Sequence, residues 1–398
     1  MNKLLGYLWL GLAVASCGGE DKPIPPLWVG PSSQSTPAEF ADAYFVKTRA
    51  DDSRPAWTVL DTGAPFSLLN GDAFDRGVPS GIGEVTALSL GDATLWRVQV
   101  IGGAGEPTPL SDGFPFGGIV GYSAFRPLRL SFDPRARAVG IGDVPLPEGV
   151  DAGVSVPLEL RGGGKISSGS IRFEYQPSRI IFDADVEGRT LRMLFDTGAS
   201  SVVLSSEIFS QIVADGRPTA ETDLSTASSS GTGSSARLRS MTVLGQTVTD
   251  VVCVSSSVIA PNLQAISEEL GEPISGLIGH AFLREFFTVV DYPGARLSLH
   301  RFVNRDYVLD DYRRVGFTLQ PSGSRFLVHR VYAGTAAAQQ VATGTEVLAI
   351  AGRSVATLGV LRAELALRGV VGSTREIQFD FGTLVLPVEE ILPTTTPP

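Results

Sequence analysis

One tripeptide occurs twice in this chain of 398 residues, as Asp61-Thr62-Gly63 and as Asp196-Thr197-Gly198. Each copy follows an apolar run and precedes a second β-prone segment. That order predicts a buried strand, a tight turn that presents an Asp, and another strand. A single Asp-Thr-Gly is a weak signal, whereas two copies in the same setting predict two copies of one structural unit.

The similarity of the two halves continues downstream of each tripeptide. Gly118-Ile119-Val120-Gly121 follows the first copy, and Gly276-Leu277-Ile278-Gly279 follows the second. In both halves an apolar run, an Asp and a basic turn then lead into a further strand. The repeat therefore divides this part of the chain into residues 37–150 and 151–304.

This double pattern resembles the retropepsin-like and pepsin-like aspartic proteases over about residues 37–303. The resemblance implies a mainly β fold, in which two double-ψ-type β-barrel lobes face each other across a pseudo-two-fold axis. It also implies that Asp61 and Asp196 meet in one catalytic site and that the two Thr hydroxyls bond across to the opposite loop. The residues that would support the catalytic pair are Thr62, Gly63, Thr197 and Gly198.

Two carboxylates a few Å apart share one proton over a wide pH range, because both cannot ionise cheaply. The ionised member can take a proton from a water while the protonated member hydrogen-bonds the substrate carbonyl. Peptide hydrolysis by this route uses no metal and no other cofactor. The three His occur without a Cys/His/Asp cluster at ligand spacing, which argues against a zinc site. We therefore expect an aspartic-type endopeptidase.

The N-terminal segment carries export signals. Residues 1–17 combine one Lys, an apolar stretch and small residues, which predicts a signal peptide rather than a spanning helix. Val14-Ala15-Ser16-Cys17 resembles the bacterial lipoprotein box, so Cys17 would become a lipidated N-terminus. An ordinary signal peptide that contains a Cys is the alternative. Residues 18–36, rich in Pro, Ser and Gly, are expected to form an exposed tether. The expected location is the bacterial cell envelope, with Gly18 favouring the outer membrane.

The two halves differ in one interval. From Asp196 to Gly245 the chain runs 49 residues, against 30 from Asp61 to Gly91. The added length holds the Gly/Ser-rich segment 222–235. Aspartic proteases place a mobile β-hairpin flap in this interval, so we expect the second lobe to provide the main flap. A disordered surface loop is the alternative, and the sequence identifies no individual flap residue.

Residues 305–398 are expected to form a third unit that resembles a bacterial PDZ domain. A small-residue helix start at Gly334 is followed by Gly344-Thr345-Glu346-Val347-Leu348, where the family usually has Gly-Asp. PDZ domains bind an extended peptide as an added strand, so a peptide is a candidate ligand. The predicted helix Leu358–Arg368 would form one wall of the groove. The alternative is a unit that packs on the protease as a structural or regulatory part.

The remaining titratable residues have simpler interpretations. Cys253 lies in an apolar strand and is expected to be a buried, inert thiol. Asp183 and Asp185 are expected to be solvated strand or turn residues. His280 is expected to be an ordinary surface or packed residue, because a two-Asp site requires no His.

The net charge and the internal repeat limit which classes of binding partner we expect. A net charge of −10 provides no basic surface for nucleic acid. Both halves are present in one chain, so a monomer can build the site, and the expected partners are a peptide or protein substrate and the membrane that holds the N-terminal lipid. The alternative function is a catalytically silent, peptide-binding lipoprotein. The two intact Asp-Thr-Gly tripeptides favour catalysis.

Overall fold

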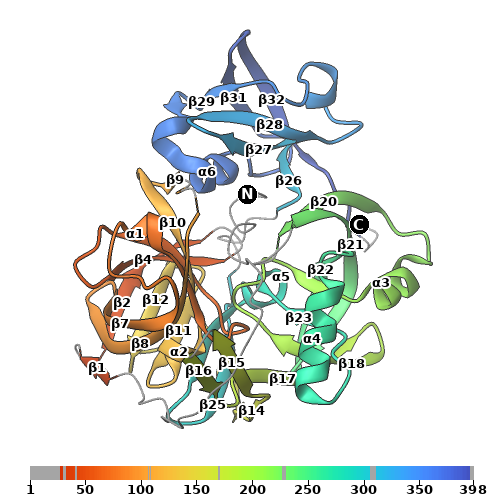
Figure 1. Cartoon of the computed structure of the whole chain (residues 1–398). Coiled ribbons are helices and arrows are strands. Elements are labelled where there is room, and N and C mark those ends of the chain that lie inside the picture. Colours follow the sequence, from red (N-terminus) through yellow and green to blue (C-terminus); the bar gives the residue numbers. More distant parts are fainter. Residues whose placement is uncertain are drawn as a thin grey trace.

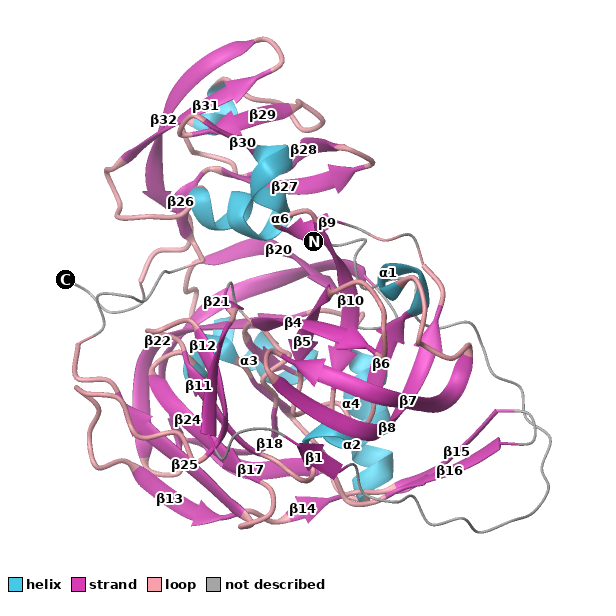
Figure 2. Cartoon of the chain, turned by 90° about the vertical axis from the view of Figure 1, so that its left-hand side faces the viewer, coloured by secondary structure: helices cyan, strands magenta, loops and turns pink. Residues whose placement is uncertain are grey.

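The computed structural model describes residues 27–29, 33–40, 43–105, 107, 109–168, 171–225, 230–304 and 311–394. Two lobes lie side by side, and a smaller C-terminal unit sits above both of them (Figure 1). The fold is mainly β with barrel-like sheets, as predicted (Figure 2). The predicted signal peptide and the lipidation of Cys17 lie outside the described residues.

The first lobe is built on a nine-stranded sheet, with its main strand order β1-β8-β6-β10-β5-β4-β3. Strand β7 pairs with β4 and β8, and β9 pairs with β10. The elements of this lobe are β1 (Leu27–Val29), β3 (Glu39–Phe40), β4 (Tyr44–Ala50), β5 (Ala56–Leu60), β6 (Ser67–Asn70), α1 (Gly71–Phe74), β7 (Gly81–Leu90), β8 (Ala93–Gly103), β9 (Pro109–Ser111), β10 (Phe114–Val120) and α2 (Tyr122–Phe125).

The second lobe has an eight-stranded sheet of order β14-β17-β18-β23-β19-β22-β21-β20 and a separate hairpin, β15–β16. Its elements are β14 (Leu160–Arg161), β15 (Gly164–Ser168), β16 (Ile171–Tyr175), β17 (Arg179–Val186), β18 (Arg189–Phe195), β19 (Val202–Leu204), α3 (Ser206–Val213), β20 (Thr219–Ser225), β21 (Ser230–Val243), β22 (Gln246–Ser255), α4 (Ala260–Leu270), β23 (Gly276–Ile278) and α5 (His280–Leu283).

The same strand pairing occurs in both lobes. In the first, β10 lies between β5, to which it is parallel, and β6, to which it is antiparallel, while β6 is parallel to β8. In the second, β23 lies in the same way between β18 and β19, and β19 is parallel to β22. In each lobe, therefore, the Gly-aliphatic-aliphatic strand separates the strand that enters the Asp-Thr-Gly turn from the strand that leaves it.

A six-stranded sheet joins the two lobes, in the order β13-β25-β24-β11-β12-β2. Its central pair is antiparallel, with one strand from each lobe, β11 and β24. A continuous hydrophobic core runs through both lobes and includes residues of this sheet. The strands of the sheet are β2 (Ser33–Pro37), β11 (Arg129–Asp133), β12 (Ala138–Gly142), β13 (Val154–Pro157), β24 (Phe286–Asp291) and β25 (Arg296–Arg301).

The expected tether, residues 18–36, is corrected at its C-terminal end. Ser33–Pro37 pairs with β12, and Leu27–Val29 pairs with β8, so these segments belong to the sheets. The composition of the segment suggested a solvated linker, but the open edges of β12 and β8 supply backbone partners that composition does not reveal.

The C-terminal unit contains a five-stranded sheet, a two-stranded sheet and one long helix. Its core also includes residues of the first lobe, among them Phe45, Trp57 and Val59. The elements are β26 (Arg313–Val315), β27 (Phe317–Ser322), β28 (Arg325–Val331), η1 (Ala337–Gln339), β29 (Val347–Ile350), β30 (Arg353–Ser354), α6 (Val355–Ala366), β31 (Thr374–Phe379) and β32 (Gly382–Glu390).

Several single residues lie where the sequence predicted. Strand β17 alternates the exposed Asp183 and Asp185 with the buried Ala184 and Val186, which is the two-residue period of a half-buried strand. Cys253 is buried in β22, and burial raises the pKa of its thiol to about 12, which keeps it protonated and unreactive.

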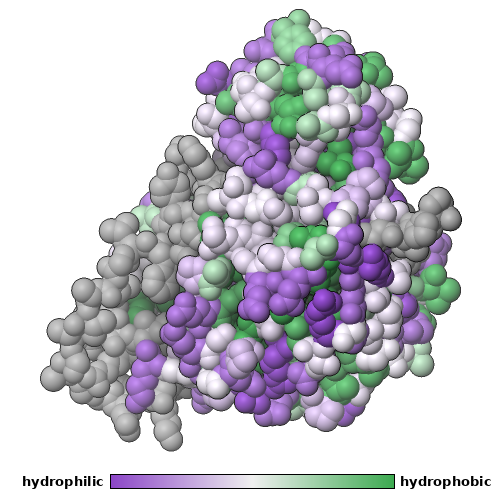
Figure 3. Space-filling model, turned by 90° about the vertical axis from the view of Figure 1, so that its right-hand side faces the viewer, coloured by the Kyte–Doolittle hydropathy of each residue, from purple (hydrophilic) through white to green (hydrophobic). Residues whose placement is uncertain are grey.

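The described surface is mixed in character. On the face shown in Figure 3, hydrophilic and hydrophobic side chains are interspersed over the second lobe and the C-terminal unit. Within the described ranges, no helix has both the length and the hydropathy that a bilayer crossing requires.

Candidate active site

The two Asp-Thr-Gly turns meet between the lobes. Asp61 follows the last residue of β5, and Asp196 follows the last residue of β18. The N–H of Asp61 donates to the carbonyl of Val120, and the N–H of Asp196 donates to the carbonyl of Ile278, both at 3.0 Å. Each acceptor ends the strand that lies between the two arms of the turn, so that strand fixes where the carboxylate emerges.

The glycines of the two turns show how close the carboxylates are to the opposite loop. A Cβ added to Gly63 would lie 2.7 Å from Cγ of Asp196, and one added to Gly198 would lie 2.5 Å from Cγ of Asp61. Both distances are too short for any side chain. The structure therefore brings Asp61 and Asp196 together, and glycine at both positions is what permits the approach.

Backbone N–H groups orient each carboxylate within its own turn. Oδ1 of Asp61 accepts from Gly63 at 2.7 Å and from Ala64 at 3.0 Å. Oδ1 of Asp196 accepts from Gly198 at 2.8 Å. Bonds to these N–H groups leave the second oxygen of each carboxylate available to its neighbour or to a ligand.

The two threonines link the turns to each other. The N–H of Thr62 donates to Oγ1 of Thr197, and the N–H of Thr197 donates to Oγ1 of Thr62, both at 3.1 Å. The hydroxyl of Thr62 donates to Phe195 O at 3.2 Å, and that of Thr197 donates to Leu60 O at 2.8 Å. Both hydroxyls are buried and are used as donor and acceptor, so this four-bond link restricts movement of one turn relative to the other.

The surroundings of the pair favour its protonated forms. Burial between the lobes, the charge of Asp196 and a hydrogen bond with Asp196 hold the pKa of Asp61 well above its ordinary value. Burial also raises the pKa of Asp196, although the bond with Asp61 opposes the shift. The pKa of each carboxyl therefore depends on the protonation state of the other.

Two residues beside the pair were not identified from the sequence, Arg179 and Glu269. Nη1 of Arg179, at the start of β17, donates to the carbonyl of Gly63, and its Nη2 lies 3.0 Å from Oε2 of Glu269 in α4. Arg179 is the first residue of β17, which pairs with β18, the strand leading into Asp196, and a hairpin of this kind could have suggested its proximity. No sequence signal relates Glu269 to the site.

His280 lies behind the second turn, where it is buried. Its Nε2 is 2.8 Å from the carbonyl of Thr197, which assigns a hydrogen to that nitrogen, and its ring makes an edge contact with Tyr44. His280 is therefore a packed residue that supports the loop backbone.

The interval expected to hold the flap contains the hairpin β20–β21, paired from Thr219 with Ala236 to Ser225 with Ser230. Residues 226–229, at its tip, lie outside the described residues. In the first lobe, the described residues between α1 and β7 form no hairpin. Closure of this hairpin over a substrate stays a prediction.

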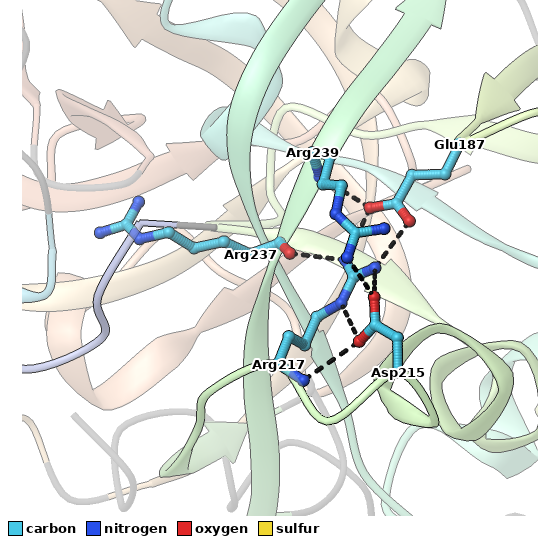
Figure 4. Close-up of polar contacts among 5 residues, drawn as sticks. All are labelled: Glu187, Asp215, Arg217, Arg237 and Arg239. Carbon is cyan, nitrogen blue, oxygen red and sulfur yellow. Dashed lines mark hydrogen bonds and ion pairs between the residues drawn. The ribbon is translucent and has the colours of Figure 1, made fainter. Parts of the chain in front are cut away.

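A cluster of charged side chains holds the base of this hairpin (Figure 4). Arg217 donates to Glu187 at 2.6 and 2.7 Å, to Asp215 at 2.7 and 3.0 Å, and to the carbonyl of Arg237 in β21 at 2.8 Å. The N–H of Arg239 donates to Glu187 at 2.6 Å. The side chain of Arg237 points away from this cluster and donates to the carbonyl of Leu392 at 2.8 Å.

The C-terminal unit contacts both lobes. In the second lobe, Arg330 of β28 pairs with Glu221 at 2.6 Å and with Asp223, both in β20. In the first lobe, α6 packs on β9, where Gly359 has φ +72° and a Cβ would lie 2.4 Å from the carbonyl of Leu110. Only glycine combines that backbone angle with that approach, so α6 is kinked at this contact.

Side chains of the same unit occupy one edge of β27. Glu364 of α6 accepts from the N–H of Leu319, and Arg314 donates to the carbonyl of Phe317 at 3.0 Å. Arg314 and Glu364 form a buried ion pair with each other. Two of the backbone groups needed to add a strand are thus already bonded.

Among the described residues, no three or more His, Cys, Asp or Glu side chains cluster so as to hold a metal ion.

Comparisons with known proteins address part of this picture. The aspartyl protease family model matches residues 182–282, a segment that contains Asp196 but not Asp61. A retropepsin-like aspartic protease from Rickettsia conorii aligns at 17% identity with a TM-score of 0.25, over 37% of this chain and 91% of that chain. A photosystem II D1 C-terminal processing protease aligns at 19% identity with a TM-score of 0.19, over 21% of this chain and 24% of that chain. No curated protein matches the sequence. Residues 182–282 therefore match the aspartyl protease family, and this match supports an aspartic protease.

Proposed function

We propose that the chain is an aspartic endopeptidase whose catalytic residues are Asp61 and Asp196. The observation that carries the proposal is the meeting of the two carboxylates, each against the glycine of the opposite turn. The repeated strand pairing and the central β11–β24 pair support two lobes related by a pseudo-two-fold axis, with one Asp from each.

The chemistry follows from the shared proton. With one carboxylate ionised, a water held between the pair gives up a proton to it and attacks the peptide carbonyl carbon. The protonated carboxyl hydrogen-bonds the carbonyl oxygen as negative charge develops there. The carboxyl that took the proton from water then gives it to the amide nitrogen, and the C–N bond breaks, which leaves the pair with one proton again. The four-bond link between the turns keeps the two carboxylates in place, so little reorganisation accompanies these steps.

The test is cleavage of an unbiased peptide mixture between about pH 3 and 7, with products identified by mass spectrometry. Full-length protein in detergent is compared with Asp61→Asn and Asp196→Asn. Loss of cleavage in each single variant is the expected result. Cleavage that survives either change would sink the shared-pair mechanism, and no cleavage by the wild type would favour the silent peptide-binding alternative.

For the C-terminal unit we propose a PDZ-like fold whose main role is to hold the flap hairpin. The contacts of Arg330 with Glu221 and Asp223 support this role, and the bonded edge of β27 counts against an open peptide groove. A peptide that bound along β27 would have to displace Glu364 of α6 from the N–H of Leu319. Binding of such a peptide would therefore change how α6 packs in this unit.

We propose lipid anchoring through Cys17 in the bacterial cell envelope, on the N-terminal sequence alone. Incorporation of labelled palmitate into wild type but not into Cys17→Ser tests this, and equal labelling of both would overturn it. The proposed form is a monomer, since each chain carries both turns.

A further inference from the structure

The side chain of Arg179 reaches from the second lobe to the turn of the first. Its Nη1 donates to the carbonyl oxygen of Gly63, and the N–H of the same peptide unit, that of Ala64, donates to Oδ1 of Asp61 at 3.0 Å. One peptide group therefore stands between a guanidinium and a catalytic carboxylate, with its oxygen toward the cation and its hydrogen toward the anion.

This arrangement strengthens the hold on the carboxylate. A cation at the carbonyl oxygen polarises the peptide group, and the polarised N–H becomes a better donor to the carboxylate beyond it. Both interactions are partly buried, and electrostatic effects are screened less there than in bulk water. Orientation and charge thus act together on Asp61.

Glu269 keeps the guanidinium in position and offsets part of its charge. Its Oε2 lies 3.3 Å from Nε and 3.0 Å from Nη2 of Arg179, and both side chains are only 12% exposed. Its Oε1 accepts from the N–H of Gly163 at 3.2 Å, and its carboxylate also bonds the hydroxyl of Tyr175. The orientation of Arg179 is therefore set from outside the catalytic turns.

At the corresponding position of the first lobe, which is among the described residues, there is no arginine. Ile181 pairs with Leu194, two residues before Asp196, and Phe45 pairs with Val59, two residues before Asp61. The position two residues ahead of Ile181 is Arg179. The corresponding position ahead of Phe45 is Ala43, which packs in the core shared with the C-terminal unit. The electrostatic surroundings of the pair are thus asymmetric by sequence.

We propose that Arg179 is a positioning residue that acts through the Gly63–Ala64 peptide group to orient Asp61 and to set the pH range in which the pair holds one proton. The inference rests on the proposed function. The positive charge of Arg179 lowers the pKa of both catalytic carboxyls, against the upward effect of burial. Because Glu269 offsets part of that positive charge, Arg179 and Glu269 act in opposite directions on the pKa values of the pair.

The other titratable groups around the pair come from three elements. Tyr292, in the turn between β24 and β25, interacts with Asp61, and burial raises the pKa of its hydroxyl, so it stays neutral. Tyr122 of α2 packs edge-on against Tyr292, and burial raises its pKa as well. His280 of α5 bonds the carbonyl of Thr197. The charged groups that set the pH range are thus the pair itself, Arg179 and Glu269.

The test is the pH dependence of kcat/KM for the full-length protein, which reports the free enzyme. Arg179→Gln removes the cation, so both limbs of the profile move to higher pH. Glu269→Gln removes the anion that offsets it, so both limbs move to lower pH. Arg179→Lys keeps the charge and keeps the limbs near their wild-type positions. Arg192→Gln, which removes an arginine of the neighbouring strand β18 that pairs with Glu272, leaves the limbs unchanged.

Opposite shifts separate the proposal from a purely structural role, because Arg179→Gln and Glu269→Gln break the same ion pair. Shifts in one common direction, or none, would overturn it. The thermal stability of each variant, measured against pH with and without Asp61→Asn and Asp196→Asn, reports titration of the pair without any cleavage. Opposite shifts in that measurement, with no peptide cleaved by wild type, would refute the endopeptidase proposal and leave the electrostatic role standing.

Discussion

Two groups of carboxylates in this molecule have opposite electrostatic surroundings. Asp61 and Asp196 face each other and a set of N–H groups, and their pKa values are raised chiefly by burial. Glu187 and Asp215 flank Arg217, which is only 3% exposed. Burial opposes the ionisation of Glu187, but bonds from Arg217 and from the N–H of Arg239 outweigh it and hold the pKa of this carboxyl below its ordinary value. Bonds from Arg217 likewise lower the pKa of Asp215.

The difference teaches what decides the role of an acid that folding removes from water. Burial acts to raise the pKa of Glu187 as it does those of Asp61 and Asp196, so burial alone does not separate the two groups. The guanidinium of Arg217, between Glu187 and Asp215, keeps both carboxylates ionised, and the three side chains together hold the base of the β20–β21 hairpin. Among the described residues, no such cation lies between Asp61 and Asp196, and Arg179, whose charge lowers the pKa of both, is paired with Glu269. This arrangement favours retention of a proton by the pair.

The largest effect should come from substituting Asp61 or Asp196. Asp61→Asn and Asp196→Asn each lower kcat/KM on the order of 10³-fold or more, because each removes a group that transfers a proton. Neither lowers thermal stability, because the raised pKa values mean that ionisation of the pair costs folding free energy. Loss of activity accompanied by a fall in Tm of many degrees would contradict the comparison.

The second effect is on stability and should appear at Arg217. Arg217→Met leaves the mostly buried Glu187 without its cation and lowers the free energy of unfolding by about 3–5 kcal/mol. The matched control is Arg239→Met, which removes a 59% exposed partner of the same Asp215 and costs less than about 1 kcal/mol. Thermal melts of the two variants at pH 7 make the measurement. Equal losses would show that Arg217 acts as a surface residue.

Stability should also respond to pH with opposite signs in the two places. The folded-state pKa of Glu187 lies below its ordinary 4.5, so its contribution is complete above that pH and is lost as pH falls through the folded value. The folded-state pKa of Asp61 lies above its ordinary 3.8, so a destabilising contribution grows as pH rises from there.

Between about pH 3 and 7, the difference in free energy of unfolding between wild type and Arg217→Met should widen with pH. The advantage of the Asp61→Asn, Asp196→Asn double variant over wild type should widen too. A gap that narrows with pH in either series would refute the corresponding assignment.

The mainly β fold could be predicted from local strand–turn–strand patterns that occur twice, and the resemblance to aspartic proteases implied that Asp61 and Asp196 meet. It did not identify Arg179 and Glu269, which lie 90 residues apart in the chain and meet only through packing of α4 against the start of β17. The pairing of Ser33–Pro37 with β12 was also missed, since an open sheet edge leaves no trace in the segment that fills it. The occupied edge of β27 depends on Glu364 reaching back from α6, a contact that the resemblance to PDZ domains gave no reason to expect.

The smallest effect should come from the contact between β28 and the flap hairpin. Arg330 is 15% exposed and pairs with Asp223, which is 13% exposed. Arg330→Met removes the guanidinium from this mostly buried carboxylate and so loosens β20. Hydrogen exchange along Thr219–Ser225 should quicken, and KM should rise a few-fold with little change in kcat, because a looser hairpin holds substrate less well without altering the two carboxylates. The control is Arg325→Met in the same strand, where a 60% exposed arginine lies 3.9 Å from Glu346. If both variants exchange like wild type, the C-terminal unit does not hold the flap, and the charged cluster at Arg217 is left as the device that fixes this hairpin.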